Sequence, residues 1–187
     1  MKLKLGQIGI VQDEKLTGWL SEQDGLGTIW LAGQIKSTTM AFSCNEDEKV
    51  PTSSFRVIKA NTKVTPQVIN GRIRMRVNVK TSGTLMEYRC AEDLSTPASI
   101  TKVEQAIAEQ LKRIMMKSWE ALQKQRADIV GFGTLIHEKY PRYWKSIASS
   151  WNDRLDNVEL DLRVKVKINR VGMSSKSFES ILNESKQ

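Results

Sequence analysis

Residues 158–170, with the sequence VELDLRVKVKINR, alternate between apolar and polar side chains almost without interruption. Val158, Leu160, Leu162, Val164, Val166 and Ile168 share one parity. A period of two is typical of a β-strand with one buried face and one face in water. The segment RIRMRVNVK at 72–80 repeats the pattern. We therefore expect two long strands of this kind.

Shorter β-rich segments lie around these two. The residues TPQ at 65–67 separate two such runs and predict the connection of a long hairpin. Ser82 and Gly83 predict a break before the last of them, and 45–53 reads as a polar loop. The predicted strands are 6–11, 16–20, 38–44, 54–64, 68–80, 84–90 and 158–170.

The pattern changes to a helical period after residue 96. Apolar residues from Ile100 to Leu122 recur at steps of three and four, which predicts one amphipathic helix over 97–127. Thr96 before Pro97 suits an N-cap and a first helical residue, although Thr101 and Glu104 also fit a capping box. This helix is long enough to cover a sheet.

Two shorter helices are expected beside the long one. Ser21 is a candidate N-cap for a helix weakened by its two glycines. Gly131 and Gly133 are expected to end the long helix, and Pro141 to begin a short one with Trp144 and Trp151 on one face. We expect most of the five tryptophans to be core residues, and 173–187 to form a polar tail or a short terminal helix.

Strands first, helices next and a strand last indicate an α+β fold. We expect a largely antiparallel β-sheet of about 4–6 strands, with the long amphipathic helix and the shorter helices packed on one face. At 187 residues the chain is expected to form a single domain, 1–187.

The net charge of +8 favours an anionic partner. If the two alternating strands are adjacent and antiparallel, their polar faces bring together up to eight cations. These are Arg72, Arg74, Arg76, Lys80, Arg163, Lys165, Lys167 and Arg170. The row is either a solvated face, a contact for a protein or an anionic surface, or a nucleic-acid site, but it lacks aromatic residues on which bases could stack. Glu159 and Asp161 interrupt it.

Other chemistry has few candidates in this sequence. His137 is the one histidine, and no nucleophile motif lies near it. Cys44 and Cys90 have neither a CxxC nor a Cys/His pattern, so we expect no catalytic residue, no metal and no cofactor. No apolar run reaches the length of a membrane span.

The segment from Lys124 to Gly172 resembles the signature region of the Ger(x)C family, the C subunit of the nutrient germinant receptors of spore-forming bacteria. Weaker likeness extends over nearly the whole chain and corresponds to the C-terminal domain of that family. The matching residues are Gln125, Asp128, Gly131, Phe132, Gly133, Pro141, Trp144 and Trp151, followed by the step Arg170, Val171, Gly172.

The resemblance implies a non-enzymatic protein that takes part in nutrient-triggered germination. Family members are lipoproteins on the outer face of the inner spore membrane, where they act with integral-membrane A and B subunits. This sequence shows no signal segment or lipobox, so we interpret it as a C-terminal domain of a larger subunit, or a divergent short form, soluble by itself. The alternative function is that of a nucleic-acid-binding protein that uses the basic sheet face. If the chain is a receptor subunit, we expect no nucleic-acid partner.

Two roles are open for the matching residues. Gly131, Phe132, Gly133 and Pro141 are expected to serve turns and packing, and Trp144 and Trp151 to fix the short helix. Asp128 could cap that helix or pair with a basic residue. Gln125 and Asp128, one turn apart, could equally present a polar patch to another subunit. The expected contact surface is Arg72, Arg74, Arg76, Arg163, Lys165, Lys167, Gln125 and Asp128.

Overall fold

The computed structural model describes residues 7–12, 14–43, 53–90 and 94–171. By its internal contacts the chain divides into two compact units. Unit 1 comprises Met1–Gln34, Thr62–Asn78 and Lys112–Arg163, and unit 2 comprises Ile35–Asn61, Val79–Leu111 and Val164–Gln187. Several long elements pass through both units, so each unit contains part of the main sheet and part of the long helix.

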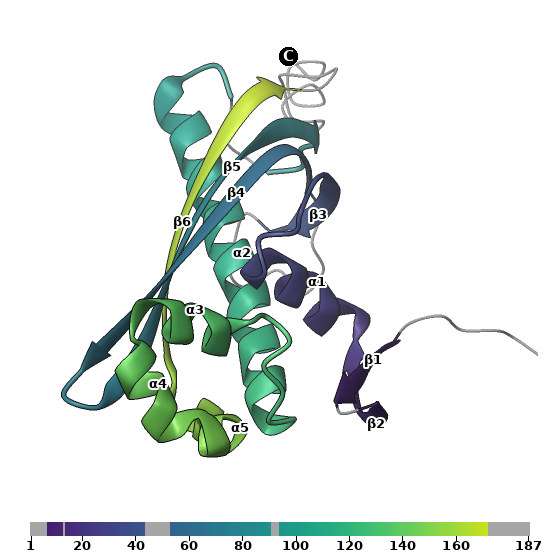
Figure 1. Cartoon of the computed structure of the whole chain (residues 1–187). Helices are drawn as coiled ribbons and strands as arrows, with labels where there is room; N and C mark the ends of the chain where they lie inside the picture. Colours follow the sequence, from purple (N-terminus) through teal and green to yellow (C-terminus); the bar gives the residue numbers. More distant parts are fainter. Residues whose placement is uncertain (1–6, 13, 44–52, 91–93, 172–187) are drawn as a thin grey trace, which may run out of the picture. The chain divides into compact units, whose positions relative to one another are not determined.

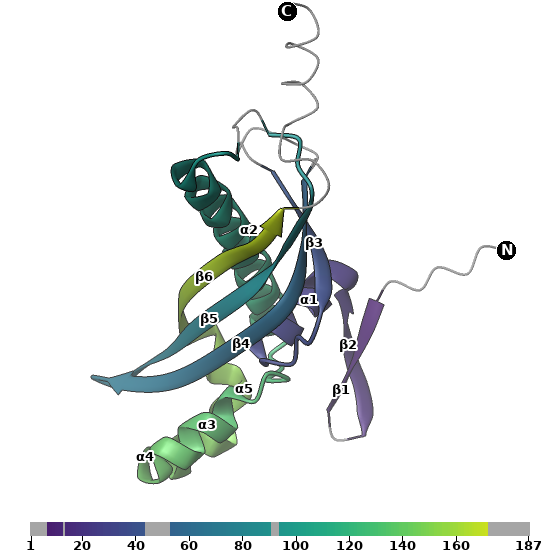
Figure 2. The same ribbon diagram turned by 90° about the horizontal axis from the view of Figure 1, so that it is seen from above.

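The main sheet has four strands in the order β3-β4-β5-β6 (Figures 1 and 2). Their bounds are β3 Thr38–Phe42, β4 Ser53–Ile69, β5 Arg72–Glu87 and β6 Glu159–Val171. β3 pairs with β4 in antiparallel register. Asn70 and Gly71 form a two-residue turn between β4 and β5 and both have positive φ, 50° and 77°. This is the backbone that an Asn-Gly hairpin turn requires.

β6 runs parallel to β5, which the sequence did not predict. Arg74 pairs with Glu159, and two residues further along both strands Arg76 pairs with Asp161. Such a forward step on both strands occurs only in a parallel pair. The helices between β5 and β6 return the chain to the starting end of β5, and a crossover of this kind joins parallel strands. The sheet is thus largely antiparallel with one parallel pair, and the predicted α+β class is confirmed.

The predicted connection at TPQ was wrong, because β4 continues through Thr65, Pro66 and Gln67 to Ile69. Pro66 lacks an N–H, but β3 pairs only with residues 53–57 of β4. The missing donor is therefore tolerated where β4 has one unpaired side among the described strands. The Asn-Gly pair fits the tight turn better than the proline does.

The predicted break at Ser82 and Gly83 was also wrong, since β5 runs through both residues. A Cβ at position 83 would collide with the backbone carbonyl of Arg56 and lie 2.8 Å from the ring of Phe55. Gly83 is therefore a site of close approach to β4 rather than a break. Alternate β5 side chains from Ile73 to Leu85 are buried, which continues the predicted pattern.

The N-terminal part of unit 1 is a two-stranded antiparallel sheet followed by a helix. β1 (Gln7–Gln12) pairs with β2 (Lys15–Ser21), and the register shifts between Ile10 and Val11. Ser21 accepts a hydrogen bond from Asp24 N and caps α1 (Glu22–Leu31) as predicted. A Cβ at Gly27 of α1 would collide with Ser118 and with the carbonyl of Ile114. Glycine at this position therefore permits close packing of α1 against the long helix that contains both residues.

The long helix α2 spans Pro97–Lys124. Thr96 caps it by accepting a hydrogen bond from Ser99 N at 3.2 Å, so of the two predicted starts the earlier is confirmed. The helix ends three residues before the prediction, and Arg126 follows it with φ 50°. The predicted apolar face is buried in both units: Val103, Ile107 and Leu111 in unit 2, and Met115, Trp119 and Leu122 in unit 1.

The segment after α2 differs from the single short helix that we predicted. Gly131, with φ 77°, precedes a helix that the sequence did not suggest, α3 (Phe132–Lys139), and Gly133 lies inside it. Pro141 begins α4 (Pro141–Ile147), as expected. The remainder breaks into short turns, η1 (Ala148–Ser150), α5 (Trp151–Arg154) and η2 (Leu155–Asn157).

The tryptophans divide between core and surface. Trp30, Trp119 and Trp151 are buried, Trp144 is half-buried, and Trp19 is 54% exposed. The prediction that most of the tryptophans are core residues is thus confirmed, and Trp19 is the exception. Cys90 is buried. Gly6, Cys44, the 45–52 loop and the 173–187 tail of the sequence predictions lie outside the described residues.

Candidate functional site

The polar face of β5 and β6 holds the basic row that the sequence singled out, but the parallel register changes its chemistry. The offset between partners is constant, 74 with 159 and 76 with 161. The acidic start of β6 therefore lies beside the arginines of β5, whereas an antiparallel pair would have placed it elsewhere. Within unit 1 two carboxylates, Glu159 and Asp161, thus neutralise half the charge of the four arginines of the predicted row.

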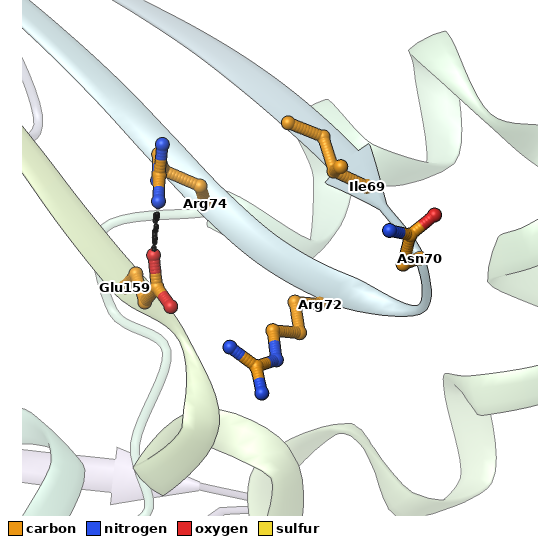
Figure 3. A pocket seen from close by; sticks show the side chains of 5 residues that line it. All are labelled: Ile69, Asn70, Arg72, Arg74 and Glu159. Carbon is orange, nitrogen blue, oxygen red and sulfur yellow. Dashed lines mark hydrogen bonds and ion pairs between the residues drawn. The ribbon is translucent and has the colours of Figure 1, made fainter.

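The first of these pairs lines a hollow at the β4–β5 turn (Figure 3). Arg74 donates two hydrogen bonds to Glu159 Oε2, at 2.9 Å from Nε and 2.7 Å from Nη2. Arg72 points into the same hollow, which has a volume of about 480 Å³ and is completed by Ile69 and Asn70. The hollow is thus lined by two arginines and one carboxylate, which is bound to Arg74, so it carries a single excess positive charge.

Asp161 is held by two arginines on the same face. Arg76 Nε donates to Asp161 Oδ2 at 2.7 Å, and Arg163 approaches the same atom at 3.4 Å. The hydrogen bond from Arg76 lowers the pKa of Asp161 below its ordinary value; burial opposes the change and Arg163 adds to it. The Asp161 side chain is 27% exposed, so this pairing is better shielded from water than the others on the face.

Replacing Asp161 with asparagine is expected to lower the free energy of unfolding by about 1 kcal/mol at pH 7. The folded-state pKa is depressed, so the stabilisation is present above the unfolded pKa and is lost as pH falls through the folded value. Urea denaturation should therefore separate variant and parent at pH 7 and bring them together as the pH falls through the depressed pKa of Asp161. Asp153→Asn is the control, because the Arg126–Asp153 pair is 62% and 69% exposed. A pH-independent difference for Asp161→Asn would contradict this account.

In unit 2 the same face is basic without acidic partners on the strands. Lys165 and Lys167 of β6 line a hollow together with Lys80 of β5 and Lys59 of β4. Lys167 lies 3.5 Å from Glu104 of α2, and no other ion pair joins these lysines to a described residue. The sequence analysis did not include Lys59 in the basic row. The position of the turn at Asn70 and Gly71 determines which β4 residues lie beside Lys80, and the turn was predicted elsewhere.

The family-signature residues gather around one carboxylate in unit 1. Asp128 Oδ1 accepts from Phe132 N at 2.9 Å, and Oδ2 accepts from Gly133 N at 2.6 Å and from Trp151 Nε1 at 2.8 Å. The first backbone N–H groups of a helix have no partner within that helix. Asp128 therefore caps α3 from outside and ties it to α5.

Aromatic rings complete this signature cluster of Asp128, Phe132, Gly133, Trp144 and Trp151. The rings of Trp144 and Trp151 meet edge to face, with centroids 5.5 Å apart, and Phe132 lies 5.0 Å from Trp119 of α2. Geometry of this kind is favourable for aromatic pairs. The exposed His137 has its ring 6.1 Å from that of Trp144. The cluster is a packed support for the α3–α5 segment.

The β1–β2 hairpin adjoins the signature cluster. Gln125 lies against Gly18 of β2, where a Cβ would come within 3.0 Å of its amide carbon. A hollow of about 330 Å³ is lined by Val11 and Gln12 from the hairpin and by Asp128, Trp144 and Trp151 from the cluster. Gln125 and Asp128 thus lie in one region, but Gln125 packs against β2 and Asp128 binds α3 and α5.

An apolar row is exposed beside this hollow. Val11 is 63% exposed, Leu16 56%, Trp19 54% and Ile129 41%. Val11 and Leu16 are register partners, Leu16 and Trp19 flank Gly9, and Ile129 lines the hollow with Val11. We call these four residues the hairpin patch. The sequence did not reveal it, because an alternating strand pair does not show which of its faces is covered.

Two further findings concern the described residues only. They contain no group of three or more His, Cys, Asp or Glu side chains placed to hold a metal ion. None of their helices combines the length and apolar character of a membrane span.

Comparison with known proteins gives a family for this architecture. The family described as "Spore germination B3/ GerAC like, C-terminal" matches residues 6–172. The crystal structure of the GerBC protein aligns with a TM-score of 0.78 at 24% identity, over 90% of this chain and 52% of that one. It shares the fold of the described residues.

Curated relatives come from Bacillus subtilis (strain 168). Spore germination protein KC is 26% identical over 156 residues, which is 83% of this chain and 38% of the relative. Spore germination protein B3 is 25% identical over 179 residues, 94% of this chain and 47% of the relative. The chain thus spans less than half the length of these relatives. The match over residues 6–172 confirms the resemblance seen in the sequence: the chain belongs to the Ger(x)C family, and corresponds to its C-terminal domain.

Proposed function

We propose that this chain acts as a non-enzymatic domain of a germinant receptor C subunit and takes part in nutrient-triggered germination by binding another receptor subunit. The family membership supports the role in spore germination. The hairpin patch supports the contact, since it presents Val11, Leu16 and Trp19 side by side with more than half of each side chain in water.

The physical reason is the cost of leaving such a row in water. A buried Leu or Val side chain is stabilised by about 1.5–3 kcal/mol relative to an exposed one. Contiguous exposed apolar residues are therefore typical of a surface that a partner covers. Tryptophan, here the half-exposed Trp19, is also a residue type that often contributes strongly to binding at protein interfaces.

The partner that we propose is an integral-membrane A or B subunit, at the outer face of the inner spore membrane. In this proposal the chain is the C-terminal domain of a larger lipoprotein subunit, held near the membrane by the lipid of the full-length protein. In this proposal Gln125 and Asp128 do not contact the partner themselves. Gln125 supports the hairpin at Gly18, and Asp128 is occupied by three donors of α3 and α5.

The test is the double variant Leu16→Ser and Trp19→Ser in the full-length protein in spores. Both residues are exposed, so the fold should persist and the melting temperature should change by less than about 3 °C. Co-purification of the A and B subunits is expected to fall by about tenfold or more, since truncation of an interface anchor costs at least about 2 kcal/mol. Nutrient-triggered germination should slow in parallel.

Ile58→Ser with Met86→Ser is the matched control. These residues are 57% and 49% exposed, belong to unit 2 and lie outside the hairpin patch. They should leave co-purification unchanged. Wild-type recovery of both subunits by the Leu16/Trp19 variant would remove the hairpin patch from the proposal.

A further inference from the structure

We propose that unit 2 contains a binding site for a phosphate group, in the hollow formed by Lys59, Lys80, Lys165 and Lys167, which we call the lysine groove. The hollow has a volume of about 540 Å³ and is also lined by Asn61, Thr81 and Ser82. It shares no residue with the hairpin patch.

The strand registers bring these lysines together. Counting back from the Asn70–Gly71 turn places Asn61 opposite Lys80 and Lys59 opposite Ser82. The offset of the parallel pair continues from 74 with 159 to 80 with 165 and 82 with 167. Two transverse rows result, the first with Asn61, Lys80 and Lys165, and the second with Lys59, Ser82 and Lys167. Each row has two lysines and one neutral polar side chain.

The charge of the groove is poorly compensated. Its lining residues include no carboxylate. Glu104, which is 15% exposed, lies 3.5 Å from Lys167, but the same Oε1 atom accepts a hydrogen bond from Ile168 N at 2.8 Å. Like charges on adjacent strands repel one another. At the other end of the same strands Glu159 and Asp161 relieve such repulsion; here a bound anion would do so.

The dimensions favour a compact anion. Two residues along a strand span about 7 Å and two strand spacings about 10 Å, so the four ammonium groups surround a small area. A phosphate group accepts several charge-assisted hydrogen bonds at once, and lysine supplies three donors each. Ser82 and Asn61 add neutral donors beside them. An extended nucleic acid would need a longer basic track with aromatic platforms, and no aromatic residue lines the groove.

Thr81 supports the groove from beneath. Its side chain is buried, and its Oγ1 donates to the carbonyl of Lys59 at 3.0 Å. This hydrogen bond holds the β4 backbone against β5 at Lys59. The floor of the groove is therefore a paired sheet rather than a loop.

The test compares Lys80→Gln/Lys165→Gln with the parent chain. Titration with inorganic pyrophosphate, followed by backbone amide NMR, should shift the signals of residues 59–61, 80–82 and 165–167. We expect the double variant to bind about tenfold more weakly or worse, because two charge-assisted contacts are lost. Parent affinity should fall as salt rises, since exposed charges are screened over about 8 Å at 0.15 M.

The source of the phosphate is distinguished by a second arm. Cosedimentation is measured with vesicles of phosphatidylglycerol and phosphatidylcholine, and with vesicles of phosphatidylcholine alone. Binding to pyrophosphate but to neither vesicle assigns a soluble phosphate compound. Binding to the anionic vesicles that the double variant loses assigns a lipid headgroup.

Arg142→Gln/Lys145→Gln is the charge-matched control, because both cations are exposed on α4 of unit 1. It should bind like the parent. The Lys80/Lys165 variant should melt at or slightly above the parent temperature, since its substitutions remove repulsion. Equal loss in the control, unchanged binding by the Lys80/Lys165 variant, no binding in either arm, or tighter binding of citrate, polyglutamate or an oligonucleotide than of pyrophosphate would each overturn the proposal.

Discussion

Replacing Asp128 with alanine is expected to lower the free energy of unfolding by about 3–5 kcal/mol, the largest effect of any single polar substitution that we predict. The change leaves Phe132 N, Gly133 N and Trp151 Nε1 without their shared acceptor. These groups are at least partly buried, so water replaces the carboxylate poorly. Urea denaturation followed by tryptophan fluorescence measures the loss and the rearrangement around Trp151.

Two variants show whether the carboxylate itself is responsible. Asp128→Asn keeps the shape of the side chain but replaces one acceptor oxygen by an NH2 donor. Its loss in free energy of unfolding should therefore be more than half of the loss caused by Asp128→Ala. Asp153→Ala removes an exposed carboxylate that pairs with Arg126 and should cost less than about 0.5 kcal/mol. An Asp128→Ala protein no less stable than Asp153→Ala would refute the capping role.

Replacing Gly133 with alanine is expected to destabilise the chain by about 3 kcal/mol, although alanine is ordinarily the better residue inside a helix by about 1 kcal/mol. The added Cβ would lie 2.7 Å from Trp144, 2.7 Å from Trp151 Nε1 and 3.2 Å from Asp128 Oδ2. It would therefore push apart the edge-to-face tryptophans and lengthen the Asp128 hydrogen bonds. Thermal unfolding and the tryptophan emission spectrum report both consequences.

Gly131→Ala separates this steric effect from loss of glycine in general. Position 131 has φ 77° and nothing within 4 Å of an added Cβ. The substitution should cost about 1 kcal/mol from backbone strain alone and leave the tryptophan emission unchanged. If Gly131→Ala were the more damaging of the two, the close packing of Gly133 would not explain its place in the signature.

Several elements followed directly from residue patterns. The alternation in 72–80 and 158–170 predicted strands with one buried parity, and β5 has it. In β6 the apolar parity is buried at Val166 and Ile168 and half-buried from Leu160 to Val164. The apolar face from Val103 to Leu122 predicted the buried side of α2. Thr96 and Ser21 predicted helix starts. In each case the signal is local, because a strand, a helix or a cap is determined by residues within a few positions of one another.

The turn of the β4–β5 hairpin was misplaced even though its signal was local. Asn70 and Gly71 form the turn and are a strong turn pair in the sequence, whereas the TPQ segment with Pro66 predicted the connection four residues too early. A proline is tolerated where no neighbouring strand requires its N–H, and pairing with β3 covers only 53–57. That limit is a property of the sheet and is absent from the sequence around Pro66.

The sequence identified most of the site residues, but not which of them lie together. The sequence identified one basic row, which consists of Arg72, Arg74, Arg76, Lys80, Arg163, Lys165, Lys167 and Arg170. The structure pairs Glu159 and Asp161 with arginines of this row and adds Lys59 to its lysines. Asp128 was named as a possible cap, whereas its bond to Trp151, 23 residues away, had no local signal.

The sequence by itself determined the α+β class, the apolar parity of the two long strands, the apolar face of α2 and the family. Only the tertiary structure decided the parallel direction of β6, the split of the basic row into paired arginines and a lysine groove, and the exposure of Trp19. The physical reason is that periodicity reports how one element divides its side chains between two faces. Direction, register and coverage depend on which distant segments pair, and a shift of two residues in that pairing changes every charge partner.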